Sequence, residues 1–474
     1  MVLPLIIQGG MGAGVSNWLL ARAVAETGQL GVVSGTAIDT IMIRRLQMGD
    51  IGGHIRRALE HFPVPEIVQR ILKRFYIPGG KSKSSFFRRL PLYSYRPGSL
   101  LQEITVVANF VEVFLAKEKH QGLIGINFLE KIQMPILASI YGAMLAGVNY
   151  ILMGAGIPWQ IPRVLEELAQ HQKTSMKVQV DQANSTDDFQ ITFDPNAVMK
   201  QKLPNIDKPK FLAIVSSATL AIALLDKTNG KIDGFIVENY LAGGHNAPPR
   251  GKLQLDESGE PKYGPKDQVD LSKMRSIDRP FWLAGTFNSP ESLKEALIAG
   301  ASGIQAGTIF AFAKESGLAE ELKHECLTLA LQGKLKIFTD PKASPTGFPF
   351  KVALLDNSIS SEAIYKARER GCDLGYLRQM YKRSDNSIGY RCPAEHIDDY
   401  VKKGGNADDT NGRKCLCNAL LANIGLAQIQ PNGFLEDPLV TLGNDVSFVP
   451  QLVTMENPSY SVKDAVTYLL RQTQ

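Results

Sequence analysis

The chain has 474 residues, 44% hydrophobic and 21% charged, enough to bury one large domain or two to three ordinary ones. Its net charge of +5 is too small to indicate nucleic-acid binding, and no nucleic-acid-binding motif is present. The N-terminal segment lacks the features of a secretory signal, and five cysteines are too few for a disulfide framework, so we expect a reducing, cytoplasmic location.

Short apolar runs that end in glycine or a small polar residue recur along the first two thirds of the chain. Most are followed by helical patterns, such as 17–26, 218–225 and 290–299. Eight such units predict a parallel (β/α)8 TIM barrel over residues 1–340, with active-site groups at the C-terminal ends of the strands. The expected strands are 5–8, 31–34, 123–127, 150–153, 211–215, 234–238, 281–284 and 303–306.

A doubly wound sheet is the alternative fold, and the glycines after the first strand bear on it. The segment Gly9-Gly10-Met11-Gly12-Ala13-Gly14-Val15 does not have the spacing of the dinucleotide fingerprint. No acidic residue follows at the position that this fingerprint requires. The barrel is therefore the preferred prediction.

Two insertions interrupt the repeats. Residues 52–98 are rich in Arg, Lys and aromatic residues, which predicts a solvated excursion, with a lid or a docking surface for an acidic partner as the functional alternative. Residues 177–209 alternate apolar and polar side chains and predict a small hairpin.

One uncharged stretch, 132–162, is long enough to span a bilayer. Its pattern instead predicts a helix rich in small residues over 134–146, a break at Gly147, and a short core strand at 150–154. We therefore expect no membrane association.

A buried strand over 233–237 leads through Glu238 to Ala242-Gly243-Gly244-His245. Glycines allow a backbone to approach a flat or anionic ligand closely, because no Cβ intervenes. A histidine just beyond the end of a barrel strand is well placed for catalysis. The alternative is a turn that carries a histidine without a catalytic role.

The strand–helix repeat is absent from residues 341–474. We expect this part of the chain to form an α-rich extension packed over the barrel. Four of the five cysteines lie there, and Cys326 is interpreted as a core residue. Four thiolates can hold an iron–sulfur cluster or a structural zinc, but the spacing contains no CxxC pair, so four reduced structural cysteines remain an alternative. These residues are Cys372, Cys392, Cys415 and Cys417.

Four motifs together resemble the nitronate monooxygenase (2-nitropropane dioxygenase) family of FMN-dependent barrel enzymes, which includes flavin-dependent enoyl-acyl-carrier-protein reductases. They cover residues 3 to about 350 in the order of the family. The motifs are Gln8-Gly9-Gly10-Met11-Gly12, Gly125-Ile126-Asn127, Ala242-Gly243-Gly244-His245 and Gln305-Ala306-Gly307-Thr308.

The resemblance implies an FMN site. Gly285, Gly307 and Thr308 would hold the phosphate, although Thr286 replaces a usual glycine. Asn127 would bond to the ring or the ribityl chain, and Glu238 stands where the family often has glutamine. The remaining expected contacts, several of them along the flavin ring, are Gln8, Gly9, Gly10, Met11, Gly243, Gly244 and Gln305.

The resemblance also implies a function. His245 would be the base that removes an α-proton before electrons reach the flavin, as a nitronate monooxygenase-type oxidoreductase requires. The alternative is an acyl-acyl-carrier-protein dehydrogenase/isomerase or enoyl reductase. One such branch carries FMN and a four-iron–four-sulfur cluster on a cysteine-rich tail. The expected partners are a small-molecule or acyl-thioester substrate and an acyl carrier protein. A third alternative, which is not an enzyme, is a flavin-binding regulatory protein that has lost turnover.

Overall fold

The computed structural model describes residues 3–471. Eight parallel strands form one sheet in the order β1-β12-β11-β9-β8-β4-β3-β2. Leu30, immediately before β2, closes the sheet onto β1, because Gln8 N donates to Leu30 O at 3.0 Å and Leu30 N donates to Ile6 O at 3.1 Å. The predicted (β/α)8 barrel is thus confirmed. Its strands are β1 (Ile6–Gln8), β2 (Gly31–Ser34), β3 (Ile124–Leu129), β4 (Tyr150–Gly154), β8 (Lys210–Val215), β9 (Gly234–Glu238), β11 (Phe281–Ala284) and β12 (Gly303–Ala306).

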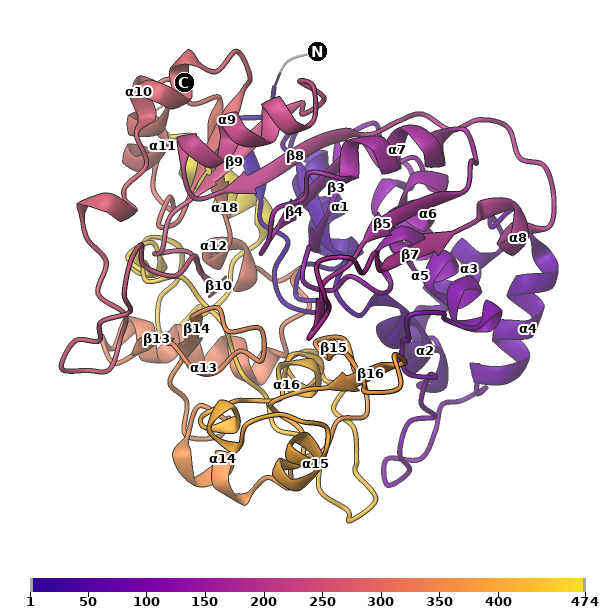
Figure 1. The fold of residues 1–474 in the computed structure, drawn as a ribbon. Helices are drawn as coiled ribbons and strands as arrows, with labels where there is room; N and C mark the ends of the chain where they lie inside the picture. The colour runs from indigo at the N-terminus through magenta and orange to yellow at the C-terminus, as the bar shows by residue number, and fades with distance from the viewer. Residues whose placement is uncertain (1–2, 472–474) are drawn as a thin grey trace.

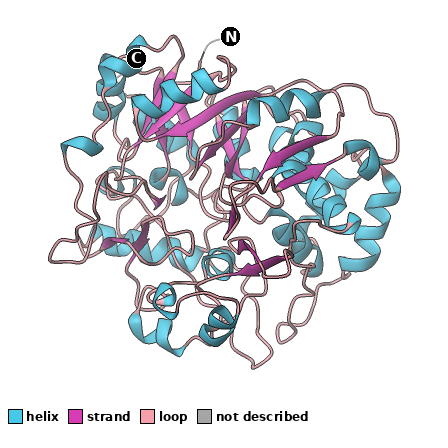
Figure 2. Cartoon of the chain, viewed as in Figure 1, coloured by secondary structure: helices cyan, strands magenta, loops and turns pink. Residues whose placement is uncertain are grey.

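All eight strands lie where the sequence predicted them, and β2, β9, β11 and β12 have the predicted bounds. Large apolar side chains from alternate positions, including Leu152, Ile236 and Trp282, fill the barrel interior. The opposite faces pack against surrounding helices (Figure 2). The helices of the barrel region are α1 (Trp18–Glu26), α5 (Ser99–Lys117), α6 (Ile136–Leu145), α7 (Ile161–Ala169), α9 (Ala218–Lys227), α10 (Leu271–Ser276), α11 (Pro290–Ile298), α12 (Thr308–Ala311) and α13 (Glu320–Leu331), with the short 3-10 turn η2 (Pro265–Asp267).

The first insertion lies between β2 and α5. The helix α2 (Ile38–Gln47) precedes residues 52–98. The insertion begins within η1 (Ile51–Gly53) and contains α3 (His54–Leu59) and α4 (Pro65–Phe75), followed by a long loop to α5. Several of its arginines form ion pairs within the protein: Arg57 with Glu118 at 3.0 Å and Arg70 with Glu103 at 2.8 Å.

A hairpin lies at the second insertion, but its first strand precedes residues 177–209 and reaches them only at Lys177. Its strands β5 (Thr174–Lys177) and β7 (Gln190–Phe193) are antiparallel, and α8 (Pro195–Met199) follows. Between them, β6 (Val180–Asp181) pairs instead with a strand of the C-terminal extension.

One helix, α5, is long and apolar enough to cross a membrane, but 78% of that stretch is buried inside the fold. The uncharged stretch 132–162 contains α6 and β4, as its pattern predicted.

The C-terminal extension, drawn in orange in Figure 1, lies below the barrel in that view, and α18 returns to pack against α1 and α11. Two small sheets join it to the rest of the chain: β10-β14-β13 and β16-β15-β6. These contacts fasten the extension to the loops at one end of the barrel. Its elements, with the strands that join it, are β10 (Gly244–His245), β13 (Ile337–Asp340), β14 (Phe350–Ala353), α14 (Glu362–Ala367), β15 (Gln379–Lys382), β16 (Ile388–Arg391), α15 (Ile397–Lys402), η3 (Ala407–Thr410), α16 (Leu416–Ala422), α17 (Val449–Leu452) and α18 (Val462–Leu469).

Candidate active site

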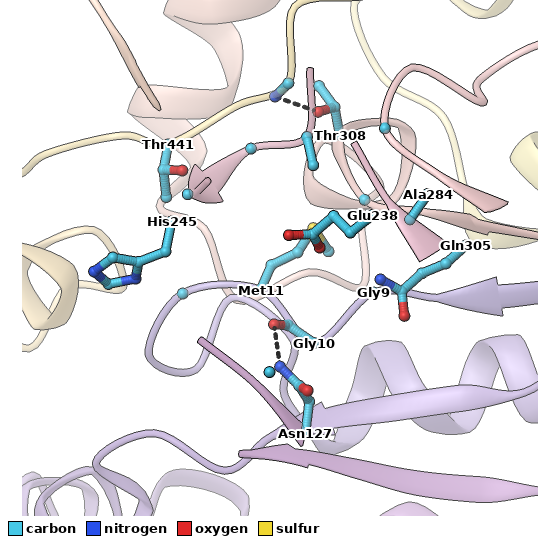
Figure 3. A pocket seen from close by; sticks show the side chains of 18 of the residues that line it. Gly9, Gly10, Met11, Asn127, Glu238, His245, Ala284, Gln305, Thr308 and Thr441 are labelled. Atoms are coloured by element: carbon cyan, nitrogen blue, oxygen red, sulfur yellow. Dashed lines mark hydrogen bonds between the residues drawn. The ribbon is translucent and has the colours of Figure 1, made fainter. Parts of the chain in front are cut away.

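A cavity of about 1240 Å³, open to solvent, lies where the barrel strands end (Figure 3). This position is where barrel enzymes carry their active sites. All but one of the predicted flavin-contacting residues line it, as does His245. These lining residues are Gly9, Gly10, Met11, Asn127, Glu238, Gly243, Gly244, His245, Gly285, Gln305, Gly307 and Thr308.

Gln8 is the exception, so its expected place along the flavin edge is not reproduced. Its side chain is fully buried beneath the cavity floor. Its Oε1 accepts from Val32 N at 2.9 Å and its Nε2 donates to Ser16 Oγ at 2.8 Å. With both ends of the amide bonded inside the protein, Gln8 shapes the first turn rather than contacting a ligand.

The turn after β1 comes very close to β3. A Cβ on Gly10 would lie 2.4 Å from Cβ of Asn127, and Asn127 Nδ2 donates to Gly10 O at 3.4 Å. Only glycine fits at this approach. The turn is therefore held against the cavity wall, where a flat ligand could lie on it.

Three amide oxygens in the cavity wall have no hydrogen-bond partner among the described residues. They are Oδ1 of Asn127, Oδ1 of Asn288 and Oε1 of Gln305. A buried polar atom without a partner costs free energy, and native proteins normally satisfy it with a ligand or with water. The wall therefore suits a ligand that presents N–H or O–H donors at several points.

The segment after β11 keeps a glycine-like backbone despite the threonine. Gly285 has φ of 101° and Thr286 has φ of 61°, which a β-branched residue rarely adopts. Strain of this kind collects at functional sites.

Nearby, Thr308 begins α12, and its hydroxyl accepts from Gly443 N at 2.9 Å.

Glu238 and His245 are the titratable side chains of the cavity wall. Burial raises the pKa of Glu238 to about 7 and lowers the pKa of His245 to about 4. Both shifts favour the uncharged form of the group. The imidazole Nε2 of His245 lies 2.7 Å from Ser344 Oγ, and its ring packs edge-on against Phe350 at 4.8 Å. Figure 3 shows this ring directed away from Glu238 and Met11.

The sequence did not point to the part of the wall that comes from the extension. Phe350, Leu420 and the segment 441–443 all line the cavity, as does Thr36 after β2. The extension thus covers the cavity as well as the barrel. No periodicity or glycine motif marks these residues, so only the fold identifies them.

The four cysteines of the extension lie in one region. Cys372 and Cys392 are hydrogen bonded to each other, and Cys415 and Cys417 both interact electrostatically with Cys372. Within residues 3–471, however, no three His, Cys, Asp or Glu side chains are grouped so as to hold a metal ion. The iron–sulfur assignment stays a prediction.

The central part of the chain, residues 157–344, matches the family model described as nitronate monooxygenase. The resemblance to the nitronate monooxygenase family is confirmed. The match spans less than half of the chain, and at the level of reaction class it supports a flavin-type oxidoreductase. No curated protein matches the sequence.

Three solved structures are similar to this chain at low identity. FabK from Thermotoga maritima has 15% identity and a TM-score of 0.49, covering 99% of this chain and 92% of that one. The nitroalkane oxidase of Streptomyces ansochromogenes has 14% identity and a TM-score of 0.45, covering 99% and 97%. The enoyl reductase domain of MlnA from Bacillus amyloliquefaciens has 12% identity and a TM-score of 0.45, covering 99% and 96%.

Proposed function

We propose that this protein is an FMN-dependent oxidoreductase of the nitronate monooxygenase type. The observation that carries the proposal is the cavity wall, where three unpartnered amide oxygens from separate segments surround a glycine-lined floor. An isoalloxazine ring is flat and a ribityl chain carries hydroxyl donors, so both match this wall. When bound, the flavin would supply the acceptor of two electrons.

The residues of this chain fit such a cofactor. Gly9 and Gly10 leave a flat surface under the ring, and Asn127 and Gln305 offer acceptors at its edge. The phosphate would lie by Gly307 and Thr308, where backbone N–H groups at the start of α12 are available. The Thr308 hydroxyl already accepts one bond from Gly443, which favours the backbone rather than the hydroxyl as the contact.

His245 is the proposed base. Burial keeps its pKa near 4, so the imidazole is neutral at neutral pH and one of its ring nitrogens carries a lone pair that can accept a proton. In its present orientation the ring bonds to Ser344 and not to the cavity centre. Catalysis therefore requires either rotation of the side chain or a substrate that extends toward the 344–350 loop.

Reconstitution tests the cofactor directly. The purified protein is expected to bind FMN and turn yellow, and FAD is expected to bind much more weakly because the cavity has no dinucleotide fingerprint beside it. Anaerobic addition of a nitroalkane should bleach the flavin. Protein that stays colourless with FMN would remove the basis of this proposal.

A second function is favoured by one specific observation: no Lys or Arg is among the described residues that line the cavity. An anionic nitronate would enter such a site without a counter-charge, at a desolvation cost that an uncharged acyl thioester does not meet. The alternative is thus a dehydrogenase or enoyl reductase that acts on carrier-bound thioesters.

The basic first insertion supports that alternative, since acyl carrier proteins are acidic. Although Arg57 and Arg70 are used in ion pairs, Lys73 and Lys83 are exposed and have no ion-pair partner in the part of the chain that the structure describes. Bleaching by a nitronate, by a saturated acyl thioester, or by NAD(P)H followed by reoxidation with an enoyl thioester separates the two functions.

An iron–sulfur cluster on Cys372, Cys392, Cys415 and Cys417 is part of the alternative. Four thiols have the right donor chemistry, but within residues 3–471 they are not grouped so as to hold one metal ion. Anaerobically purified protein should contain iron and acid-labile sulfide if the cluster forms. Absence of both, with Cys415→Ser and Cys417→Ser variants folding normally, would leave the cysteines as packing residues.

A further inference from the structure

Glu238 stands beside the place where the flavin would lie. It is the last residue of β9, and it is in register with Ala284 of β11, which is in register with Gln305 of β12. Residues in register on parallel strands face the same side of a sheet, and all three line the cavity. Figure 3 shows the Glu238 side chain near Met11 at the centre of the site.

The carboxyl group has no compensating charge. No ion pair or hydrogen bond to Glu238 occurs among residues 3–471. The elements that face it contribute Met11, Asn127, Ala284, Gln305 and Thr308, none of which titrates. The remaining titratable neighbour is His245, which burial holds in the neutral form at neutral pH.

The lack of a cation in the cavity affects how the site can accommodate a reduced cofactor. Two electrons added to a bound cofactor bring negative charge into a cavity without a fixed cation. A carboxylate in the same cavity would repel that charge, and like charges at short distance raise the pKa of one another. Protonating the carboxyl group removes the repulsion. Its pKa already lies near 7 because of burial, so this protonation needs little free energy.

We propose that Glu238 is the proton-storing residue of the site, which binds a proton when the flavin is reduced and releases it when the flavin is oxidised. The inference rests on the proposed flavin cofactor. On reduction, two electrons and one proton reach the flavin from the organic substrate. In a potential measurement, dithionite supplies the electrons and water supplies the proton. A second proton passes from solvent to the Glu238 carboxylate, and both steps reverse on oxidation.

The reduction potential of bound FMN, measured as a function of pH, tests this role. At pH 9, where Glu238 is ionised beside the oxidised flavin, Glu238→Gln removes a negative charge. The variant is expected to have a potential at least 30 mV higher than the unsubstituted protein, which corresponds to about a tenfold change in the two-electron equilibrium. At pH 5 the carboxyl group is neutral in both oxidation states, so the two proteins are expected to agree within about 10 mV.

Glu130→Gln is the matched control. Glu130 follows β3, is partly buried and has a raised pKa because of burial, but it does not line the cavity. Its substitution is expected to move the potential at neither pH. A structural effect of Glu238→Gln would shift the potential equally at pH 5 and pH 9, and that result, or no shift at either pH, would overturn the proposal.

The unsubstituted protein provides a second measurement if the variant fails to fold. Between pH 7 and pH 9 its potential is expected to fall by about 59 mV per pH unit, the value for two protons per two electrons. A slope of about 30 mV, for one proton, would overturn the proposal. Protein that binds no flavin refutes the proposed function itself, whereas protein that binds flavin with the single-proton slope refutes only the role of Glu238.

Discussion

The two sides of the cavity wall are built in different ways. The barrel side comes from strand ends, where Glu238, Ala284 and Gln305 stand in register and face inward together. The extension side comes from loops and one short helix, which contribute Leu420 and the segment 441–443. The strand side is fixed by hydrogen bonds between neighbouring strands, whereas the loop side is fixed by close contacts with the barrel turns. The reaction is therefore expected to depend on the residues of the barrel side. Ligand retention and access are expected to depend on the residues of the extension side.

His245 lies where the two sides meet, and its removal is expected to have the largest effect. His245→Ala should lower the rate of flavin reduction by a neutral carbon acid by roughly 10²- to 10⁴-fold, because proton abstraction loses its base. FMN affinity should change little, since the proposed phosphate contacts are backbone groups. Stopped-flow absorbance under anaerobic conditions measures the rate, and a pre-formed nitronate should be less affected because its proton is already gone.

Ser344→Ala is the control for this variant. It removes the hydroxyl that bonds to Nε2 of His245 but keeps the imidazole. Since a neutral hydrogen bond contributes about 1 kcal/mol, the rate should change by about fivefold or less. If His245→Ala reduces flavin as fast as the unsubstituted protein, the histidine only orders the loop between the barrel and the extension.

The close contact between Gly243 and the extension allows a second, smaller test. A Cβ on Gly243 would lie 2.8 Å from the backbone carbon of Leu442 and 2.9 Å from the nitrogen of Gly443. Gly243→Ala should therefore push the 441–443 segment away from the cavity. Overpacking of this kind costs about 1–3 kcal/mol, so FMN affinity should fall by roughly 10- to 100-fold, as measured by fluorescence titration.

Gly264→Ala is the matched control, because a Cβ there meets nothing within 4 Å and the residue has a negative φ. It should leave FMN affinity unchanged. Equal affinity for Gly243→Ala and Gly264→Ala would mean that the 441–443 segment has no part in retaining the ligand.

The difference between the two sides also explains how far the sequence could predict the site. Buried parallel strands have short apolar runs that end in glycine, so all eight barrel strands and about half of the barrel residues of the cavity could be predicted. Gln8 could not be placed correctly, because its bonds to Val32 and Ser16 depend on the closure of the barrel. Leu420 and Thr441 have no local signal, since their position depends on how the extension folds back over the strand ends.

The smallest expected effect is on the pH dependence of stability. It distinguishes Glu238, at a strand end, from His245, in the following loop. His245 has a pKa of about 4 in the folded protein and about 6.5 when unfolded, so the unfolded chain binds its proton first as the pH falls. The contribution of His245 to the free energy of unfolding should therefore decrease as the pH falls from 6.5 to 4, by less than about 1.4 kcal/mol per pH unit, the value for one full proton. Urea unfolding of the flavin-free protein at several pH values, compared with that of His245→Asn, measures this contribution.

Glu238 acts with the opposite sign, which gives the comparison its control. Its pKa of about 7 in the folded protein exceeds the value of about 4.5 expected when unfolded, so the folded state binds the extra proton and the contribution of Glu238 to stability decreases as the pH rises from 4.5 to 7. This pH range overlaps that of His245, so the two contributions oppose each other between pH 4.5 and pH 6.5. His245→Asn should make stability fall more steeply as the pH rises from 4.5 to 7, and Glu238→Gln should make it rise more steeply from pH 4 to pH 6.5. If the two substitutions change the slope of stability against pH in the same direction, burial at the strand end and in the loop does not shift these two pKa values in opposite directions.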